Sequence, residues 1–396
     1  MPLFRRNKKH NDEGGDAAPK KEKGSWRRPA NTAFKQQRLK AWQPILTPKT
    51  VLPTLFIIGI VFAPIGGLLV WGSGLVSEMT FDYTQCEKQT PSSSLSQLNF
   101  VNLPKYSYRL RSSESKAPVT PPQFAFLDQS NNTSIDVSAQ RQCIIQFDVP
   151  INLEPTVLLY YKLTNFYQNH RRYVNSLDQK QLKGSYVAPH SLNSGECSPL
   201  ATVSGGKIIY PCGLIANSLF NDSYSGLTST TDSSSTYNFS STGIAWPGEE
   251  NKYAASPGYP ISTLVPPPNW SARFPSGYSN STPPPNLKTD QRFQNWMRTA
   301  GLPTFTKLFG RNDNTTLQKG RYQITVNLNY PVLPYSGTKS IVISTVSWIG
   351  GKNPFLGWAY VASAALLIFL AVLGTIRHMV KPRKLGDMSL LSWNRS

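Results

Sequence analysis

Two long apolar runs constrain this chain more than any other feature of its sequence. The first lies between Lys49 and Glu78 and the second between Lys352 and Arg377, and neither contains a charged residue. A helix that spans the hydrocarbon core of a bilayer needs about 20 such residues, at roughly 1.5 Å of rise per residue. The two runs therefore predict transmembrane helices, over residues 50–77 and 353–376.

Aromatic residues near the ends of the runs support this interpretation over a pair of buried helices in a soluble protein. Trp71 lies near the end of the first run, and Trp358 and Tyr360 lie near the start of the second. Amphipathic rings of this kind favour the membrane interface. The first run is too long and too far from the N-terminus for a cleavable signal peptide. We expect it to act as a signal anchor.

The charges beside the two runs predict their orientation. Residues 1–50 carry 13 Lys/Arg against 4 Asp/Glu, and residues 377–396 carry 5 against 1. The positive-inside rule places both flanks in the cytosol, and two spans require both ends on one side. The two tails carry +13 of the net charge of +20, so the densest charge lies beside a membrane, where it attracts anionic lipid headgroups. We therefore expect membrane phospholipids, and no nucleic acid, as partners of this charge.

The stretch between the spans, residues 78–352, is long enough for a domain with its own core. Apolar and polar residues alternate over 321–332, and segments 143–149, 154–163 and 339–348 also favour extended chain. The clearest helical pattern covers 290–301, with Gly301 as its expected stop. The predicted fold is a membrane protein with two transmembrane α-helices and a large β-rich, antiparallel α+β, disulfide-braced exoplasmic ectodomain.

The two ends of the chain are predicted to be cytosolic tails. Residues 1–32 are polar and basic, which favours disorder, and 377–396 form the second tail. Segment 33–49 is a juxtamembrane segment with apolar residues that include Phe34 and Trp42, so it could lie against the membrane face or a partner; a solvated tether is the alternative. Pro44 prevents a regular helix from running through this segment into the span.

The connection into the second span is short. Gly350 and Gly351 permit a bend, Asn353 suits a helix N-cap, and Pro354 suits the first helical turn. We expect this joint to couple the outer domain firmly to the helix.

Small residues form a stripe in each span. The first stripe comprises Gly59, Ala63 and Gly67, and the second comprises Gly357, Ala364 and Ala371. Stripes of this kind let helices approach closely within lipid. They could join the two spans to each other or dock them on a larger partner.

All four cysteines lie between the spans, at Cys86, Cys143, Cys197 and Cys212. An even number on the predicted exoplasmic side indicates two disulfides in an oxidising compartment. Three pairings are possible. We expect Cys197–Cys212, which closes a short loop, and Cys86–Cys143, which ties the start of the domain to a predicted core strand. Zinc is the alternative, but C-x-x-C spacing is missing.

The same region contains seven Asn-x-Ser/Thr acceptors, which predict a glycoprotein. They are Asn131, Asn132, Asn221, Asn238, Asn269, Asn280 and Asn314. A further match at Asn394 falls in a predicted cytosolic tail and should stay unmodified.

Common catalytic signatures are missing from the sequence. It contains no G-x-S-x-G, H-E-x-x-H, P-loop or D-x-D motif, and the spans carry no charged group for a proton relay. We therefore expect an accessory protein without a cofactor or metal rather than an enzyme.

Several long segments resemble the ligand-effect-modulator family, the β-subunits of phospholipid flippases (type IV P-type ATPases). The resemblance covers about Ala33 to His378. The segments that carry it are residues 33–48, 62–66, 165–176, 211–222, 243–249, 293–303 and 337–357.

The resemblance implies a non-catalytic subunit that forms a heterodimer with the catalytic α-subunit of such an ATPase. It would support folding of that partner, its exit from the endoplasmic reticulum, and lipid transport from the exoplasmic to the cytosolic leaflet. It implies residence in the endoplasmic reticulum, Golgi or trans-Golgi, endosome or plasma membrane. It also makes Asn221 the strongest glycosylation candidate. The expected partner contacts are Phe34, Trp42, Pro44, Gly350, Gly351, Asn353, Pro354, Gly357 and Ala364.

Two other classes share parts of this pattern. A subunit of a two-span ion channel has the same topology, but such channels usually carry denser ectodomain cysteines and a polar pore helix. A membrane-anchored glycosyltransferase would need a metal or nucleotide site, and the sequence offers no signature of one.

Overall fold

The computed structural model describes residues 31–40, 46–232, 235–382 and 388. The chain divides into two compact units. One unit comprises residues 55–373, and the other comprises the described parts of 1–54 and 374–396.

Two long helices coincide with the apolar runs. Helix α1 covers Pro48–Gly74 and helix α7 covers Pro354–Val380, each with a mean hydropathy of 2.3 in its most apolar window. Only 17% and 11% of those windows are buried, whereas a core helix of a soluble protein would be mostly buried. The helices therefore present apolar surface suited to lipid. Compared with the predicted spans, α1 begins and ends slightly earlier, and α7 continues past Arg377.

The smaller of two antiparallel sheets connects directly to both helices. Its strands, in spatial order, are β12 (Phe305–Asn312), β6 (Val157–Thr164), β14 (Thr338–Thr345), β1 (Glu78–Asp82) and β3 (Tyr106–Arg109). Strand β1 follows α1, and β14 precedes α7. Because β1 pairs with β14, the chain enters and leaves the domain through neighbouring strands.

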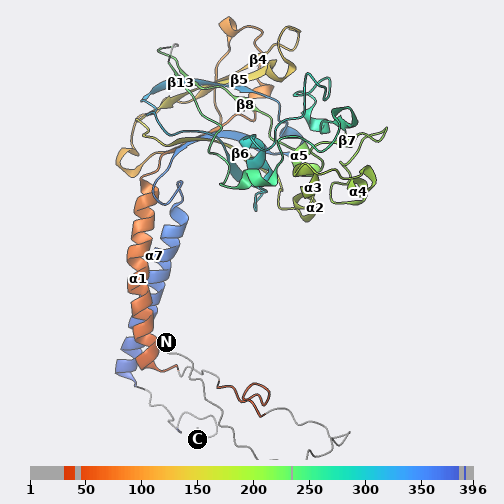
Figure 1. The fold of residues 1–396 in the computed structure, drawn as a ribbon. Helices are drawn as coiled ribbons and strands as arrows, with labels where there is room; N and C mark the ends of the chain where they lie inside the picture. The colour runs from red at the N-terminus through yellow and green to blue at the C-terminus, as the bar shows by residue number, and fades with distance from the viewer. Residues whose placement is uncertain (1–30, 41–45, 233–234, 383–387, 389–396) are drawn as a thin grey trace, which may run out of the picture. The chain divides into compact units, whose positions relative to one another are not determined.

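The larger sheet packs against the first. Its order is β10 (Thr236–Tyr237), β9 (Leu227–Ser229), β13 (Gly320–Asn327), β5 (Arg141–Val149), β4 (Gln123–Asp128) and β2 (Val101–Asn102), and β8 (Ser223–Tyr224) also pairs with β13. A separate parallel pair joins β7 (Ile208–Ile209) to β11 (Leu264–Val265). Figure 1 shows β4, β5 and β13 above β6 as two layers.

Short helices fill the connections between the strands. They are α2 (Arg171–Val174), α3 (Gln179–Leu182), α4 (Pro189–Ser194), α5 (Leu214–Asn217) and α6 (Gln291–Met297). Helix α6 is the predicted one, and its N-cap Asp290 accepts a hydrogen bond from the Phe293 N–H at 3.0 Å. The predicted stop at Gly301 is wrong, because the helix ends at Met297.

An aromatic core joins the two sheets. Phe81 of β1 and Phe147 of β5 have ring centroids 4.4 Å apart, and the Tyr108 hydroxyl of β3 donates to the Asp148 carbonyl of β5 at 3.1 Å. Burial alternates along β13, as the sequence pattern predicts. The middle domain is therefore an antiparallel sandwich, and its strands account for the four extended segments expected from the sequence.

Candidate functional site

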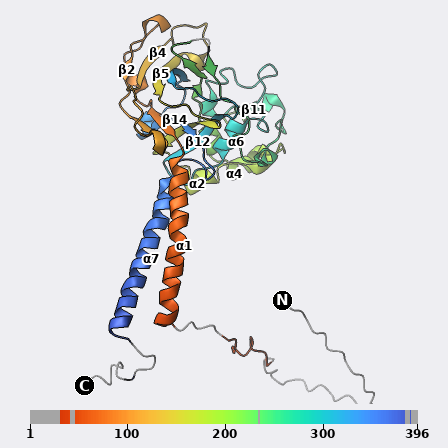
Figure 2. The ribbon, with the colours of Figure 1, turned by 90° about the vertical axis from the view of Figure 1, so that its left-hand side faces the viewer.

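Helices α1 and α7 pack closely through small residues in their middle turns and in the turns nearer the sandwich domain. A Cβ added at Gly59 would lie 3.2 Å from the Ala364 carbonyl oxygen, and one added at Gly66 would lie 3.0 Å from the Gly357 carbonyl oxygen. Ala364 and Ala371 are buried. Small residues repeated every seven positions therefore bring the two backbones together, and Figures 1 and 2 both show these helices side by side.

The predicted stripe on α7 forms this contact, but only Gly59 of the predicted stripe on α1 takes part in it. Ala63 and Gly67 are exposed, and no atom lies within 4 Å of a Cβ added at Gly67. A step of four residues turns the helix by about 40° beyond a full turn, whereas a step of seven falls only about 20° short of two turns. The seven-residue pair Gly59 and Gly66 thus stays on one face.

The joint before α7 has the expected local structure. Ser347 and Gly350 exchange two backbone hydrogen bonds of 3.0 and 2.9 Å, and the φ of +107° at Gly350 requires a glycine. The Asn353 side chain accepts from the Phe355 N–H at 3.2 Å, so it caps a helix that begins at Pro354. The chain thus turns from strand to helix within a few residues.

Two contacts that no local sequence pattern indicates hold this joint against α1 and the segments next to it. The Trp348 ring lies 3.1 Å from the position of a Cβ on Gly72. The Lys352 ammonium donates to the carbonyls of Val76 and Leu110 at 2.7 and 3.1 Å. The domain base and both helix ends are therefore linked by direct contacts.

The expected partner-binding residues fall into three groups. Phe34 lies in a turn and is 77% exposed, while Trp42 and Pro44 lie outside the described residues. Gly351, Asn353 and Pro354 are exposed at the joint, and Gly350 is half-buried. Gly357 and Ala364 instead face α1, so the structure gives them a contact within the chain. Gly357 and Ala364 can therefore support partner binding only indirectly, by holding together the helix pair whose outer surface a partner would contact.

Both expected disulfides are present. Cys86–Cys143 joins the short 3-10 helix η1 (Cys86–Lys88) to β5, and Cys197–Cys212 closes the connection that contains β7. The first therefore crosslinks the chain segment after β1 to the larger sheet.

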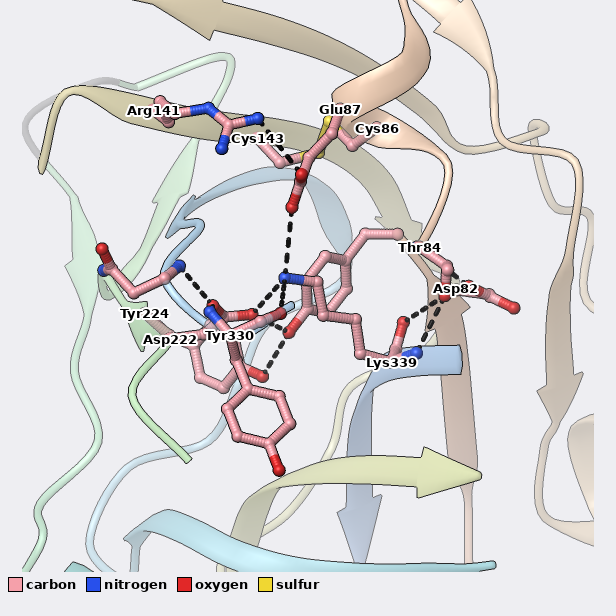
Figure 3. A network of polar contacts seen from close by, with 12 residues as sticks. Asp82, Thr84, Cys86, Glu87, Arg141, Cys143, Asp222, Tyr224, Tyr330 and Lys339 are labelled. Atoms are coloured by element: carbon pink, nitrogen blue, oxygen red, sulfur yellow. Dashed lines mark hydrogen bonds and ion pairs between the residues drawn. A yellow bond between two sulfur atoms is a disulfide. The ribbon is translucent and has the colours of Figure 1, made fainter. Parts of the chain in front are cut away.

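A buried ion pair lies beside the first disulfide (Figure 3). The Lys339 ammonium of β14 lies 2.9 Å from an Asp222 carboxylate oxygen, and both side chains are buried. Lys339 also donates to the Tyr330 carbonyl at 2.8 Å, and Glu87 lies 3.6 Å away. The pair thus joins the smaller sheet to the segment that leads into β8.

Further hydrogen bonds satisfy the Asp222 carboxylate. One oxygen accepts from the backbone N–H groups of Asn329 and Tyr330, both at 2.6 Å, and the other accepts from the Tyr83 hydroxyl at 2.9 Å. Burial and the neighbouring Asp222 charge raise the pKa of Tyr83 well above its ordinary value, so this hydroxyl keeps its proton to donate. A buried carboxylate whose oxygens all accept hydrogen bonds stabilises the fold and is not a reactive group.

A second buried cation ends helix α6. The Lys307 ammonium donates to the carbonyls of Asn295 and Trp296 at 2.8 and 3.2 Å, and also to that of Arg298. These are carbonyls of the last helical turn, which lack helical partners. This side chain therefore takes the role expected of Gly301. Burial lowers the pKa of Lys307 to about 7.

The glycosylation candidates differ in accessibility. Six of them are exposed: Asn131, Asn132, Asn238, Asn269, Asn280 and Asn314. Asn221 is half-buried and lines a cleft of about 520 Å³ together with Trp270, Arg273 and Arg292. Its Oδ1 is buried without a hydrogen-bond partner.

Comparison with known proteins gives consistent matches over most of the chain. Residues 69–384 match the LEM3 (ligand-effect modulator 3) family / CDC50 family. The phospholipid-transporting ATPase accessory subunit CDC50 of Chaetomium thermophilum is 38% identical over 93% of this chain and 91% of its own length. The accessory subunit CRF1 of Saccharomyces cerevisiae is 41% identical over 93% and 90%, and cell cycle control protein 50A of Bos taurus is 39% identical over 92% and 93%.

Proposed function

Because this chain belongs to the LEM3/CDC50 family, we propose that it is a non-catalytic accessory subunit of a phospholipid-transporting P-type ATPase. The observation that carries the proposal is the match to the accessory subunits of Chaetomium and yeast along more than nine-tenths of the chain. The match includes both membrane helices and the sandwich domain, so it is not confined to one shared module.

The geometry fits a supporting role better than catalysis. In the described part of the chain no group of three or more His, Cys, Asp or Glu side chains could hold a metal ion. The buried charged groups Lys339, Asp222 and Lys307 bond to the protein's own atoms, so they hold the fold together. A two-span ion channel has no support from the relatives.

We extend the proposal to topology and partner contacts. Both termini lie in the cytosol, supported by the 13 and 5 basic residues beside the spans, and the sandwich domain is exoplasmic. The chain forms a heterodimer with the ATPase through the segment around Phe34, through Gly350, Gly351, Asn353 and Pro354 of the joint, and through the outer surface of the helix pair. Linking several modest contacts raises their effective concentration and makes one durable complex.

The proposed cellular role follows from this arrangement. The subunit supports folding of the ATPase, its exit from the endoplasmic reticulum, and movement of phospholipid to the cytosolic leaflet at the Golgi, endosome or plasma membrane. It can bias the ATPase's conformations only through contacts that differ between them. The exoplasmic sequons, Asn221 first, are its glycosylation sites.

Affinity purification of the tagged full-length chain tests this proposal. We expect a P-type ATPase polypeptide to co-purify in equal amount, identified by mass spectrometry, with ATP hydrolysis that phospholipid stimulates. Recovery of the chain without such an ATPase, or with channel subunits instead, would contradict the assignment.

A further inference from the structure

Helix α1 is longer than a hydrocarbon core requires. It contains 27 residues, and about 20 span the core. Counted from Val51, just after the basic flank, about 20 residues reach Val70, next to the interfacial Trp71. Gly72 therefore lies at the depth of the headgroups on the domain's side, and so does whatever contacts it.

Trp348 contacts α1 at this depth. Its ring packs on Gly72, yet the side chain is 65% exposed. Leu75 and Val346 line a small cleft of about 100 Å³ nearby and are 44% and 41% exposed. Exposed apolar side chains gathered in one place mark an interaction surface, and Trp is the residue most suited to the membrane interface.

A cation lies beside these apolar side chains. The Lys352 ammonium has three N–H donors, and two of them bond to the carbonyls of Val76 and Leu110. Within the described ranges no carboxylate lies at ion-pair distance from it, and nearby Glu78 pairs with Arg109. The third N–H donor of the Lys352 ammonium is thus available to a lipid phosphate, at the depth of the headgroups.

We propose that the collar formed by Leu75, Val346, Trp348 and Lys352 is immersed in the headgroup layer of the bilayer and binds phospholipid there. The Trp348 turn packs against the upper acyl chains, and the Lys352 ammonium donates to a lipid phosphate. The phosphodiester is the shared chemistry, so the collar accepts phospholipids of any headgroup. The collar sets the height of the sandwich domain above the membrane.

Fluorescence quenching in nanodiscs tests the immersion directly. All four cysteines of the chain are in disulfides, so an introduced cysteine is its only free thiol. We would label Val346→Cys with the fluorophore NBD in full-length protein, in phosphatidylcholine nanodiscs with some phosphatidylserine. The control is Ser204→Cys, in the exposed turn before β7. Figure 1 shows β7, and Figure 2 shows its partner β11, at the side of the domain away from the helices.

We expect lipids spin-labelled in the headgroup or high on the acyl chain to quench the label at residue 346 severalfold more than the label at 204. Lipids labelled deep in the chain should quench it weakly. Equal quenching at the two sites would overturn the proposal. Loss of quenching when the co-purified ATPase is bound would also overturn it, because the collar would then be a protein interface. The measurement on the chain alone does not depend on the proposed function.

The phosphate contact has its own variants. Lys352→Met should lower the motionally restricted fraction of spin-labelled phosphatidylserine seen by electron spin resonance, whereas Lys352→Arg should preserve it. Lys207→Met, an exposed lysine beside Ser204, should change nothing. An unchanged restricted fraction in Lys352→Met would show that this lysine does not bind the phosphate. An equal loss of the restricted fraction in Lys207→Met would show that the effect comes from net charge alone.

Discussion

At the scale of single residues, buried charges decide how the sandwich domain holds together. Asp222 and Lys339 come from segments far apart in the chain and meet beside the first disulfide (Figure 3). Removing one partner of a buried pair leaves the other charge desolvated and uncompensated. A surface pair such as Lys252–Glu249, whose lysine is 64% exposed, carries little of this penalty.

We predict that Lys339→Met lowers the free energy of unfolding by about 3–5 kcal/mol, because Asp222 is left charged and buried. The control Lys252→Met should change it by about 1 kcal/mol or less. Chemical denaturation of the full-length protein in detergent, followed by tryptophan fluorescence, measures both. Similar small effects from the two substitutions would show that the buried pair contributes little.

Lys307 predicts a dependence of stability on pH. Burial lowers its pKa to about 7 in the folded protein, from an ordinary value of 10.5. Between these values the unfolded chain binds more protons than the folded chain, so the free energy of unfolding rises as pH increases from about 7. Below pH 7 the cost of charging the buried amine is fully present.

The measurement compares wild type with Lys307→Met between pH 7 and 9. The stability of wild type relative to the variant should increase across this window, and the exposed control Lys252→Met should show no such trend. A flat difference would mean that the three carbonyls at the end of α6 keep the ammonium charged throughout.

At the scale of elements, the sequence predicted what depends on local periodicity. Alternation and apolar runs identified β5, β6, β13 and β14 and both membrane helices. The Asn353–Pro354 start of α7 was also predictable, because capping is local.

What depends on tertiary contacts was not predictable in this way. The end of α6 is set by Lys307, which comes from the neighbouring strand β12. The face of α1 that meets α7 involves Gly66 rather than Gly67, a choice that adjacent glycines leave open in the sequence. The Asp222–Lys339 pair likewise needed the fold, because nothing in either local sequence indicates the other partner.

The two adjacent glycines make a matched test of the helix pair. Gly66→Leu places a side chain against Val361 and the Gly357 backbone and should separate the helices, whereas Gly67→Leu points into open space. Phe62 and Tyr360, whose rings lie 5.0 Å apart, provide sites for a cysteine pair joined by a short thiol crosslinker. Crosslinking should be lost in Gly66→Leu and kept in Gly67→Leu. Loss of crosslinking in Gly67→Leu but not in Gly66→Leu would show that α1 meets α7 through the face that carries Gly67.

At the scale of the whole molecule, the proposed topology predicts where protease can reach. Protease added to sealed microsomes should remove both tails and spare the domain between the helices, because both basic flanks face the cytosol. Epitope tags at each terminus and an antibody to the domain give the readout, with detergent-opened vesicles as the control. Protection of either terminus would contradict the topology.

As an accessory subunit, this chain is proposed to have no activity of its own and to be required by an ATPase. The most direct measurement is phospholipid-stimulated ATP hydrolysis by the partner ATPase, made in cells that have or lack this chain and contain no relative of it. Without the chain, we expect the ATPase to remain in the endoplasmic reticulum and to show no lipid-stimulated hydrolysis; restoring the chain should restore both its export and its hydrolysis. An ATPase that assembles, leaves the endoplasmic reticulum and turns over normally without the chain would contradict the proposed role.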